Sequence, residues 1–209
     1  MRTIQKGREP APLIQHRQKQ HADYDNYADK ATLRQTLVVD QRGVCCYCQS
    51  RIKATADGMK IEHWQCQADY PARQLDFSNL LGACLGGQGR PEREQHCDTR
   101  KGNNGLCFSV CDPAHPIERK IRFLGDGTIS SDDVTVDEEI KVVLNLNLPR
   151  LVSNRRGVLM AFQDRLGKGA RLDPARELSK WDGGQPGDLP EFAQVVVYWL
   201  QKKLAKDAR

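Results

Sequence analysis

Eight cysteines lie in one stretch of this 209-residue chain, between Cys45 and Cys111. The 44 residues before the stretch and the 98 after it contain none. Such clustering favours a local module built around a metal ion over cysteines scattered through a core. The N-terminal residues lack the apolar stretch of a secretory signal. This predicts a cytoplasmic, reducing location, where cysteines bind metals or remain free thiols.

The overall composition fits one globular core that carries such a module. Of the residues, 39% are hydrophobic and 28% are charged, and the formal net charge is +5. This mild positive charge permits a polyanionic partner without requiring one. The sequence contains no run of 18 apolar residues, so it predicts no membrane span and no membrane partner.

The patterning along the chain predicts three parts. Residues 1–22 are polar, basic and proline-containing, and we expect them to form an extended basic arm. Residues 23–111 begin with a helical pattern that Gly43 can cap, and they continue as the loop-rich cysteine region. Residues 112–209 begin with a hairpin, followed by helices whose apolar stripes we assign to the core. The last of these helices is expected to start at Pro190.

The first pair of candidate metal ligands is Cys45 and Cys48, which form a Cys-x-x-Cys motif. Two thiolates at this spacing can bind one zinc ion, and a tetrahedral site needs two more ligands. A redox motif has the same spelling, but the βαβ pattern expected around one is absent. The candidates for the other two ligands are Cys66, Cys84, Cys97, Cys107, Cys111, His96 and His115. Within that set, Cys107, Cys111 and His115 also outline a second site, for which no fourth ligand is evident.

A group of polar residues lies within the cysteine region. Glu62 and His63 are adjacent in "KIEHW", so in a regular strand their side chains would point to opposite faces. Both reach one site only if the strand ends there and the chain bends. Asn79 follows in "FSNLLGAC", and Asp98 and Lys101 lie in "HCDTRKGN".

This order of motifs resembles the HNH, or ββα-metal, endonucleases. The resemblance implies an α+β fold, in which a zinc-stapled ββα-metal (HNH) nuclease core is embedded in a mainly helical domain. It implies that His63 is the general base, that Asn79 holds the catalytic loop that aims it, and that Glu62 and Asp98 bind a catalytic Mg²⁺ or Mn²⁺. The remaining implied site residues are Cys45, Cys48, Cys84 and Cys97 for a structural Zn²⁺, with Arg100 and Lys101 for phosphate contacts.

Further segments resemble one branch of this family, the PtuB-type HNH proteins of bacterial Septu antiphage systems, including versions encoded with retrons. These segments are "KGREPAPL", "GVCCYCQSRI", "NLLGAC", "DPAHPIERKIRFLGDGTI" and "LNLNLPRLVSNRRG". The resemblance implies hydrolysis of phosphodiester bonds in DNA or tRNA by the effector subunit of a defence complex. The implied partners are a PtuA-type ATPase, the nucleic-acid substrate and, in retron versions, the reverse transcriptase with its msDNA.

Several alternatives remain open from the sequence. Twelve residues separate Cys84 from Cys97, where the family usually has a second Cys-x-x-Cys, so Cys66 or His96 can replace either ligand. Two other functions also fit: a non-catalytic, zinc-stapled nucleic-acid-binding module, and a stand-alone restriction or homing HNH endonuclease. The chain shows no separate DNA-reading domain, which counts against the latter.

Overall fold

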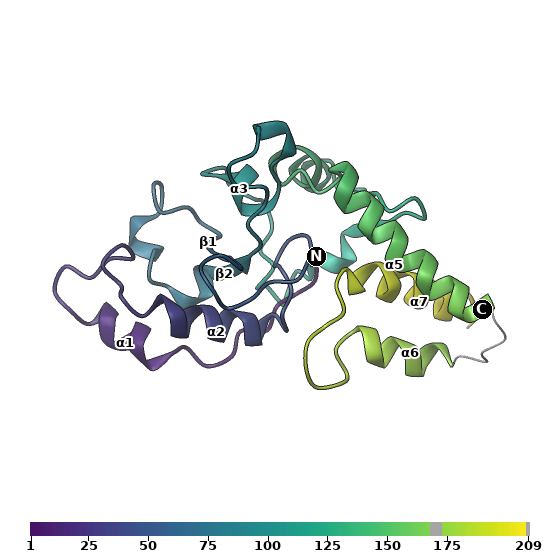
Figure 1. Ribbon diagram of the computed structural model, residues 1–209, viewed down its shortest axis with the longest axis horizontal. Coiled ribbons are helices and arrows are strands. Elements are labelled where there is room, and N and C mark those ends of the chain that lie inside the picture. Colours follow the sequence, from purple (N-terminus) through teal and green to yellow (C-terminus); the bar gives the residue numbers. More distant parts are fainter. Residues whose placement is uncertain (168–172, 208–209) are drawn as a thin grey trace.

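The computed structural model describes residues 1–167 and 173–207, which form an α+β fold. Figure 1 shows α1, α2, β1 and β2 on one side of the molecule, with α3 above the two strands, and α5, α6 and α7 on the other side. Each of the two sheets in the described residues has two antiparallel strands. Within those residues, no helix is both long and apolar enough to cross a membrane.

The cysteine-bearing half is built around a hairpin of two short strands. β1 (Lys60–His63) pairs with β2 (Leu80–Ala83), so that His63 lies opposite Leu80. α2 (Lys30–Asp40) packs against β2 and buries Leu33 and Leu37. α3 (Cys97–Lys101) is a helix of five residues that follows the hairpin. The order strand, strand, helix is therefore present in this half of the chain.

α2 begins and ends with local hydrogen bonds. The Asp29 carboxylate accepts a hydrogen bond from the backbone N–H of Thr32, which caps the first turn. At the other end, Arg42 and Gly43 both have positive φ, and the Gly43 N–H donates to the carbonyl of Val38 at 2.9 Å. This hydrogen bond ends the helix in a C-cap, in which Arg42 takes the left-handed conformation and Gly43 is the next residue.

Residues 1–22 differ from the extended arm expected from their composition. They contain α1 (Ala11–Arg17), which starts directly after Pro10, and they bury Ile4 and Leu13. The Lys6 ammonium donates to the carbonyl of Leu80 at 2.8 Å. Proline in the first turn favours a helix start because its missing N–H would be unpaired there anyway. The segment is thus packed against the first hairpin.

The C-terminal half has its own hairpin and a group of helices. β3 (Ile121–Phe123) and β4 (Ile129–Ser131) are antiparallel. The helices are α4 (Val134–Glu138), α5 (Pro149–Gly167), α6 (Pro174–Trp181) and α7 (Ala193–Asp207), and a π-helical turn (Glu139–Val143) follows α4. Single 3₁₀ turns lie at Pro71–Arg73, Phe77–Asn79, Glu92–Glu94 and Ile117–Arg119. The last helix begins at Ala193, later than the Pro190 start expected from the sequence.

Aromatic packing joins these helices. The Phe162 ring of α5 meets Trp181 of α6 and Trp199 of α7, each with ring centroids 5.7 Å apart and nearly perpendicular planes. Such edge-to-face pairs contribute about 0.5–1.5 kcal/mol each beyond their burial. The apolar stripes of the C-terminal sequence therefore form core.

Candidate functional site

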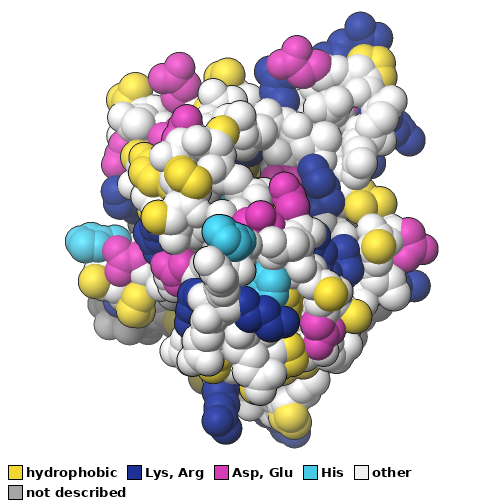
Figure 2. All heavy atoms as spheres, turned by 90° about the vertical axis from the view of Figure 1, so that its left-hand side faces the viewer, with side chains coloured by type: hydrophobic (Ala, Val, Ile, Leu, Met, Phe, Trp, Pro, Cys, Tyr) yellow, Lys and Arg dark blue, Asp and Glu magenta, His cyan; other side chains and the backbone are white. Residues whose placement is uncertain are grey.

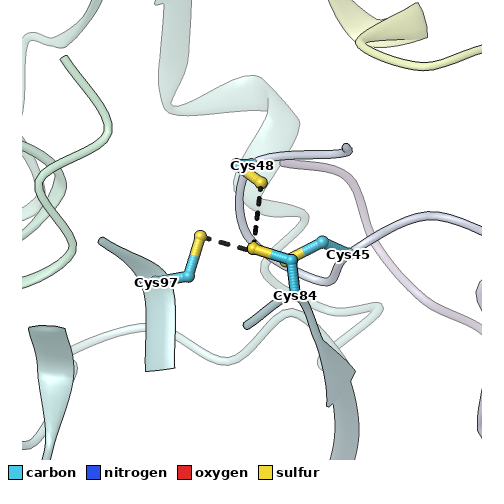
Figure 3. Close-up of side chains that lie close together, drawn as sticks. All are labelled: Cys45, Cys48, Cys84 and Cys97. Atoms are coloured by element: carbon cyan, nitrogen blue, oxygen red, sulfur yellow. Dashed lines mark hydrogen bonds between the residues drawn. The ribbon is translucent and has the colours of Figure 1, made fainter. Parts of the chain in front are cut away.

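Four cysteine side chains meet between the two halves of the molecule. The Sγ atoms of Cys45, Cys48, Cys84 and Cys97 all lie within 4.8 Å of one another (Figure 3). Two of the S–S separations are 3.9 Å (Cys45 to Cys97) and 3.7 Å (Cys48 to Cys84). Tetrahedral zinc with bonds of about 2.3 Å places its sulfurs about 3.8 Å apart. This four-cysteine cluster can therefore hold a zinc ion.

Three separate segments supply these ligands. Cys45 and Cys48 lie in a tight turn between α2 and β1, where the Cys45 N–H donates to the Ser50 carbonyl at 2.9 Å. Cys84 directly follows β2, and Cys97 is the first residue of α3. Cys97 has a φ of +55°. This left-handed backbone conformation is unfavourable in free energy for any residue other than glycine. An ion in the cluster would tie the turn, the hairpin and α3 together.

The four thiols differ in acidity because they are buried against one another. Burial raises the pKa of Cys45, but hydrogen bonds from Cys46 and from the other three thiols of the cluster outweigh it and hold that pKa well below its usual value. For Cys48, bonding with Cys45 raises the pKa, while bonds from Cys84 and Cys97 lower it to about 6. The pKa values of Cys84 and Cys97 are raised, chiefly by bonding to the other thiols and by burial. Cys45 and Cys48 thus favour the thiolate form, whereas Cys84 and Cys97 favour the thiol form, whose protons a metal ion would displace.

His96 lies beside the cluster rather than in it. Its Nδ1 is 3.1 Å from the Cys97 sulfur, and its Nε2 contacts a guanidinium nitrogen of Arg150. A guanidinium can only donate, so Nε2 accepts and the Nδ1–H donates to sulfur. Cys66 donates to the Asp69 carboxylate at 3.1 Å. Neither of the alternative ligands left open by the sequence belongs to the cluster.

Arg155 of α5 is a buried cation next to the cluster. Its side chain is 1% exposed and donates to the carbonyls of Gly127 at 2.6 Å and Leu146 at 2.8 Å. Among the described residues, no carboxylate pairs with it, and its Nη1 is buried without a hydrogen-bond partner. Burial lowers its pKa to about 10, against the opposing effect of the Cys48 and Cys97 thiols. The guanidinium therefore offsets negative charge on the cluster.

Two carboxyl groups face each other between β1 and α3. Glu62 is buried, and its Oε1 lies 2.7 Å from the Tyr47 hydroxyl and 2.9 Å from the Lys101 ammonium. Asp98 lies 2.6 Å from the Lys60 ammonium. Burial and the nearby Asp98 raise the pKa of Glu62 well above its usual value. Burial would also raise the pKa of Asp98, but hydrogen bonds from Glu62 and Lys60 outweigh it and lower that pKa. The opposite shifts leave Glu62 the more basic of the two carboxyl groups and Asp98 the more acidic.

His63 closes β1 with a fixed ring orientation. Its Nε2 lies 3.0 Å from the Gln74 carbonyl oxygen, which can only accept, so Nε2 carries the hydrogen. Burial lowers the pKa of His63, with smaller opposing contributions from that carbonyl and from the Asp98 charge. The ring is therefore neutral at neutral pH, with the Nδ1 lone pair free to accept a proton.

Asn79 holds the loop that orients His63. It is fully buried, and its Nδ2 donates to the carbonyls of Gln65 at 3.0 Å and Arg73 at 3.1 Å. Its Oδ1 accepts a hydrogen bond from the Gln65 N–H at 2.8 Å. These three bonds close the loop between β1 and β2, which includes Gln74.

The two basic residues expected to contact phosphate are placed differently from each other. Lys101 is fully buried, paired with Glu62, and donates to the His63 carbonyl at 3.2 Å, so it is not available to a substrate. α3 turns this side chain inward, away from the surface on which the sequence analysis expected a phosphate contact. Arg100 is paired with Glu92, whose side chain is 79% exposed.

The structure brings together some of the expected residues and separates others. Among the described residues, the four-cysteine cluster is the one group of three or more potential metal ligands. Within that part of the chain, Glu62, His63 and Asp98 do not form such a group. In the proposed second site, Cys107 is exposed and His115 pairs with Asp112 at 2.8 Å. Sequence analysis gave no role to Tyr24, Tyr47, Lys60, Gln74, Arg150 and Arg155, although Tyr47, Lys60, Arg150 and Arg155 lie within segments that carry the family resemblance.

Comparison with known proteins adds no assignment. A scan against protein-family models and a search of curated proteins both gave no match. What can be said of the site therefore rests on the geometry described above.

Proposed function

We propose that this chain is a metal-dependent endonuclease of the HNH type that hydrolyses phosphodiester bonds in DNA or tRNA. The observation that carries the proposal is the state of His63. Its Nε2–H is bound to the Gln74 carbonyl, which leaves a neutral ring with an acceptor at Nδ1. This is what a general base requires at neutral pH. The neighbouring carboxyl pair and the strand, strand, helix order support the same ββα-metal assignment.

In this proposal each residue has a distinct part. His63 Nδ1 takes a proton from water as the water oxygen attacks phosphorus and the bond to the leaving 3′-oxygen breaks. Glu62 and Asp98 would hold the divalent cation, since facing carboxylate oxygens suit Mg²⁺ or Mn²⁺. When bound, that cation supplies neutralisation of the phosphate and of the leaving oxygen. Asn79 keeps the loop that fixes His63 in place.

The biological setting is proposed from the sequence resemblance. The chain would be the nuclease subunit of a cytoplasmic antiphage defence complex of the Septu type, in some versions associated with a retron. Its partner would be a PtuA-type ATPase. Copurification of the two proteins, followed by cleavage assays on DNA and tRNA with and without Mg²⁺, tests the whole assignment.

A sharper test separates catalysis from folding. We expect His63→Ala to abolish cleavage while zinc content and melting temperature stay near those of the parent, because the ring is at a strand end. Cys45→Ser serves as the contrasting variant. It should lose zinc and destabilise residues 45–101, since zinc-binding energy is folding energy in small metal modules. An active His63→Ala protein would refute the base assignment.

One observation favours a second candidate, a non-catalytic zinc-stapled module that binds nucleic acid. Lys60 and Lys101 already neutralise the two carboxyl groups at 2.6 Å and 2.9 Å. A cation bound there would have to displace at least one ammonium group. Cleavage that depends on Mg²⁺ or Mn²⁺ decides for the enzyme, whereas binding without cleavage at any metal concentration decides for the module.

A further inference from the structure

An aromatic side chain lies directly against the His63 ring. The Tyr24 and His63 rings meet edge to face, with centroids 4.5 Å apart and planes at 90°. The Tyr24 N–H donates to Gln74 Oε1 at 3.1 Å, and the backbone carbonyl of the same Gln74 accepts from His63 Nε2. One residue thus fixes both rings, so Tyr24 has a defined position beside the candidate base.

Two cationic side chains, Lys30 and Arg34, lie near Tyr24. The Lys30 ammonium is 4.5 Å above the Tyr24 ring, and its other polar contact is the Asp25 carbonyl at 3.5 Å. Arg34 follows four residues later on α2, so the two share one face of the helix. Within residues 1–167 and 173–207, neither cation pairs with a carboxylate, and the Arg34 Nε is buried without a hydrogen-bond partner.

Other basic residues near the site are already bound to acids. Lys60 pairs with Asp98, Lys101 with Glu62, and Arg100 with Glu92. Figure 2 shows the side of the molecule that lies on the left in Figure 1, where histidine, basic and acidic side chains are intermingled near the centre. No uniform positive surface therefore draws a polyanion to this side. Unpaired cations beside Tyr24, whose ring contacts His63, distinguish one place on this side.

The chemistry of this group matches a nucleotide. Ammonium and guanidinium groups contact phosphate oxygens, and aromatic rings stack on unpaired bases regardless of sequence. Burial raises the pKa of Tyr24 to about 12, despite the opposing charge of Arg34. Its hydroxyl is therefore protonated at neutral pH and adds no negative charge. All three side chains are half-buried, so each keeps an accessible part.

We propose that Tyr24, Lys30 and Arg34 form the surface that holds the nucleic-acid strand at His63. Lys30 and Arg34 contact phosphates that flank the bond to be cleaved, and Tyr24 packs against the adjoining nucleotide. The inference rests on the proposed nuclease function. It assigns the phosphate contacts to Lys30 and Arg34 rather than to Lys101 of α3. It also requires the substrate to present an unpaired nucleotide.

The test measures binding without cleavage. In a His63→Ala background, fluorescence anisotropy gives the Kd for labelled single-stranded DNA, single-stranded RNA and duplex DNA. Lys30→Ala with Arg34→Ala should raise the Kd for single strands at least about tenfold and reduce the magnitude of the salt slope by about 1.4, since each phosphate contact on a single strand contributes about 0.7. Tyr24→Ala should raise the Kd about fivefold or more, and Tyr24→Phe should leave it nearly unchanged.

A matched control comes from the other end of the molecule. Lys202 lies 4.9 Å above the Tyr198 ring on α7, a similar lysine-over-tyrosine pair away from His63. Lys202→Ala should leave the Kd and the salt slope unchanged. Equal effects of Lys202→Ala and Lys30→Ala would overturn the proposal, because binding would then follow net charge alone.

The outcomes also separate this surface from the nuclease function. A protein that cleaves nucleic acid, but whose Lys30→Ala, Arg34→Ala variant binds as well as its parent, overturns the surface and leaves the nuclease intact. A protein that binds single strands through these residues without cleaving supports the surface and refutes the nuclease. A protein that neither binds nor cleaves overturns both. Weaker binding to duplex than to single strands supports the unpaired nucleotide, and preferential duplex binding refutes it.

Discussion

Replacing Lys101 with methionine would remove the ammonium group that contacts Glu62 at 2.9 Å. The Lys101 side chain is 0% exposed and the Glu62 side chain 2% exposed, so water cannot take the place of the lost charge. Methionine keeps a long unbranched chain of similar volume, and the substitution therefore removes charge without opening a large cavity. The loss of stability should come almost entirely from electrostatics.

The size of the loss follows from the burial of the pair. Removing one partner of a buried ion pair costs about 3–5 kcal/mol because the other charge is left uncompensated. Glu62 avoids part of this cost, because its pKa is already raised by burial and would lose the lowering effect of Lys101, so that it can take up a proton. We therefore expect the lower end of the range, about 3 kcal/mol. For a chain of this length, that lowers the melting temperature by about 6–12 °C.

Urea denaturation of the zinc-loaded protein at pH 7, without added magnesium, measures this difference. Arg100→Met is the matched control, because Arg100 precedes Lys101 on α3 and its partner Glu92 is 79% exposed. An exposed pair contributes at most about 1 kcal/mol. The two variants should thus differ by about 2 kcal/mol or more in the free energy of unfolding.

Equal stability of the Lys101→Met and Arg100→Met proteins would refute the reasoning, since it would mean that Lys101 is solvated and available to substrate. The Glu62→Gln, Lys101→Met double variant provides an independent check. It leaves no buried charge, so it should be more stable than the sum of the two single losses predicts. Strict additivity would mean that the two side chains do not interact.

Three further predictions concern the cluster, an ion pair and the loop. Zinc binding to the metal-free four-cysteine cluster at pH 7 should release about two protons. Calorimetry in buffers of different ionisation enthalpy measures this number. A release of four protons would contradict the mixed protonation of the thiols. Burial would raise the pKa of Glu177, but a hydrogen bond from Lys180 and the charge of Arg165 lower it. Glu177→Gln should therefore lower the free energy of unfolding by about 1 kcal/mol at pH 7. The melting curves of parent and variant should converge as the pH falls from about 4.3 through the lowered pKa of Glu177. A stability difference that does not depend on pH would contradict this ion-pair role. Asn79→Leu removes the amide that bonds three partly buried backbone groups, so it should cost about 1–3 kcal/mol and abolish cleavage with zinc retained. A stable, active variant would exclude a positioning role.

The sequence predicted the metal centre better than its surroundings. The resemblance to HNH proteins implied Cys84 and Cys97, and the four-cysteine cluster contains both, because metal ligands must be of particular residue types. The inward direction of Lys101 depends on how α3 turns against β1, and no local pattern encodes that rotation. Residues 1–22 resemble an arm because they are polar, yet Lys6 is held by the carbonyl of Leu80, far away in sequence. Contacts of this kind follow from the fold as a whole.

Arg155 has a consequence for how the chain divides into modules. All four cysteine ligands precede residue 98, whereas this guanidinium comes from α5, more than fifty residues later in the chain. A divalent ion with four thiolates carries a net charge of about −2, and a fixed cation beside it favours that dianion over the protonated thiols. A fragment ending before α5 would contain every ligand and still bind the ion more weakly. The four-cysteine cluster and the cation that compensates its charge are in this sense supplied by both halves of the protein.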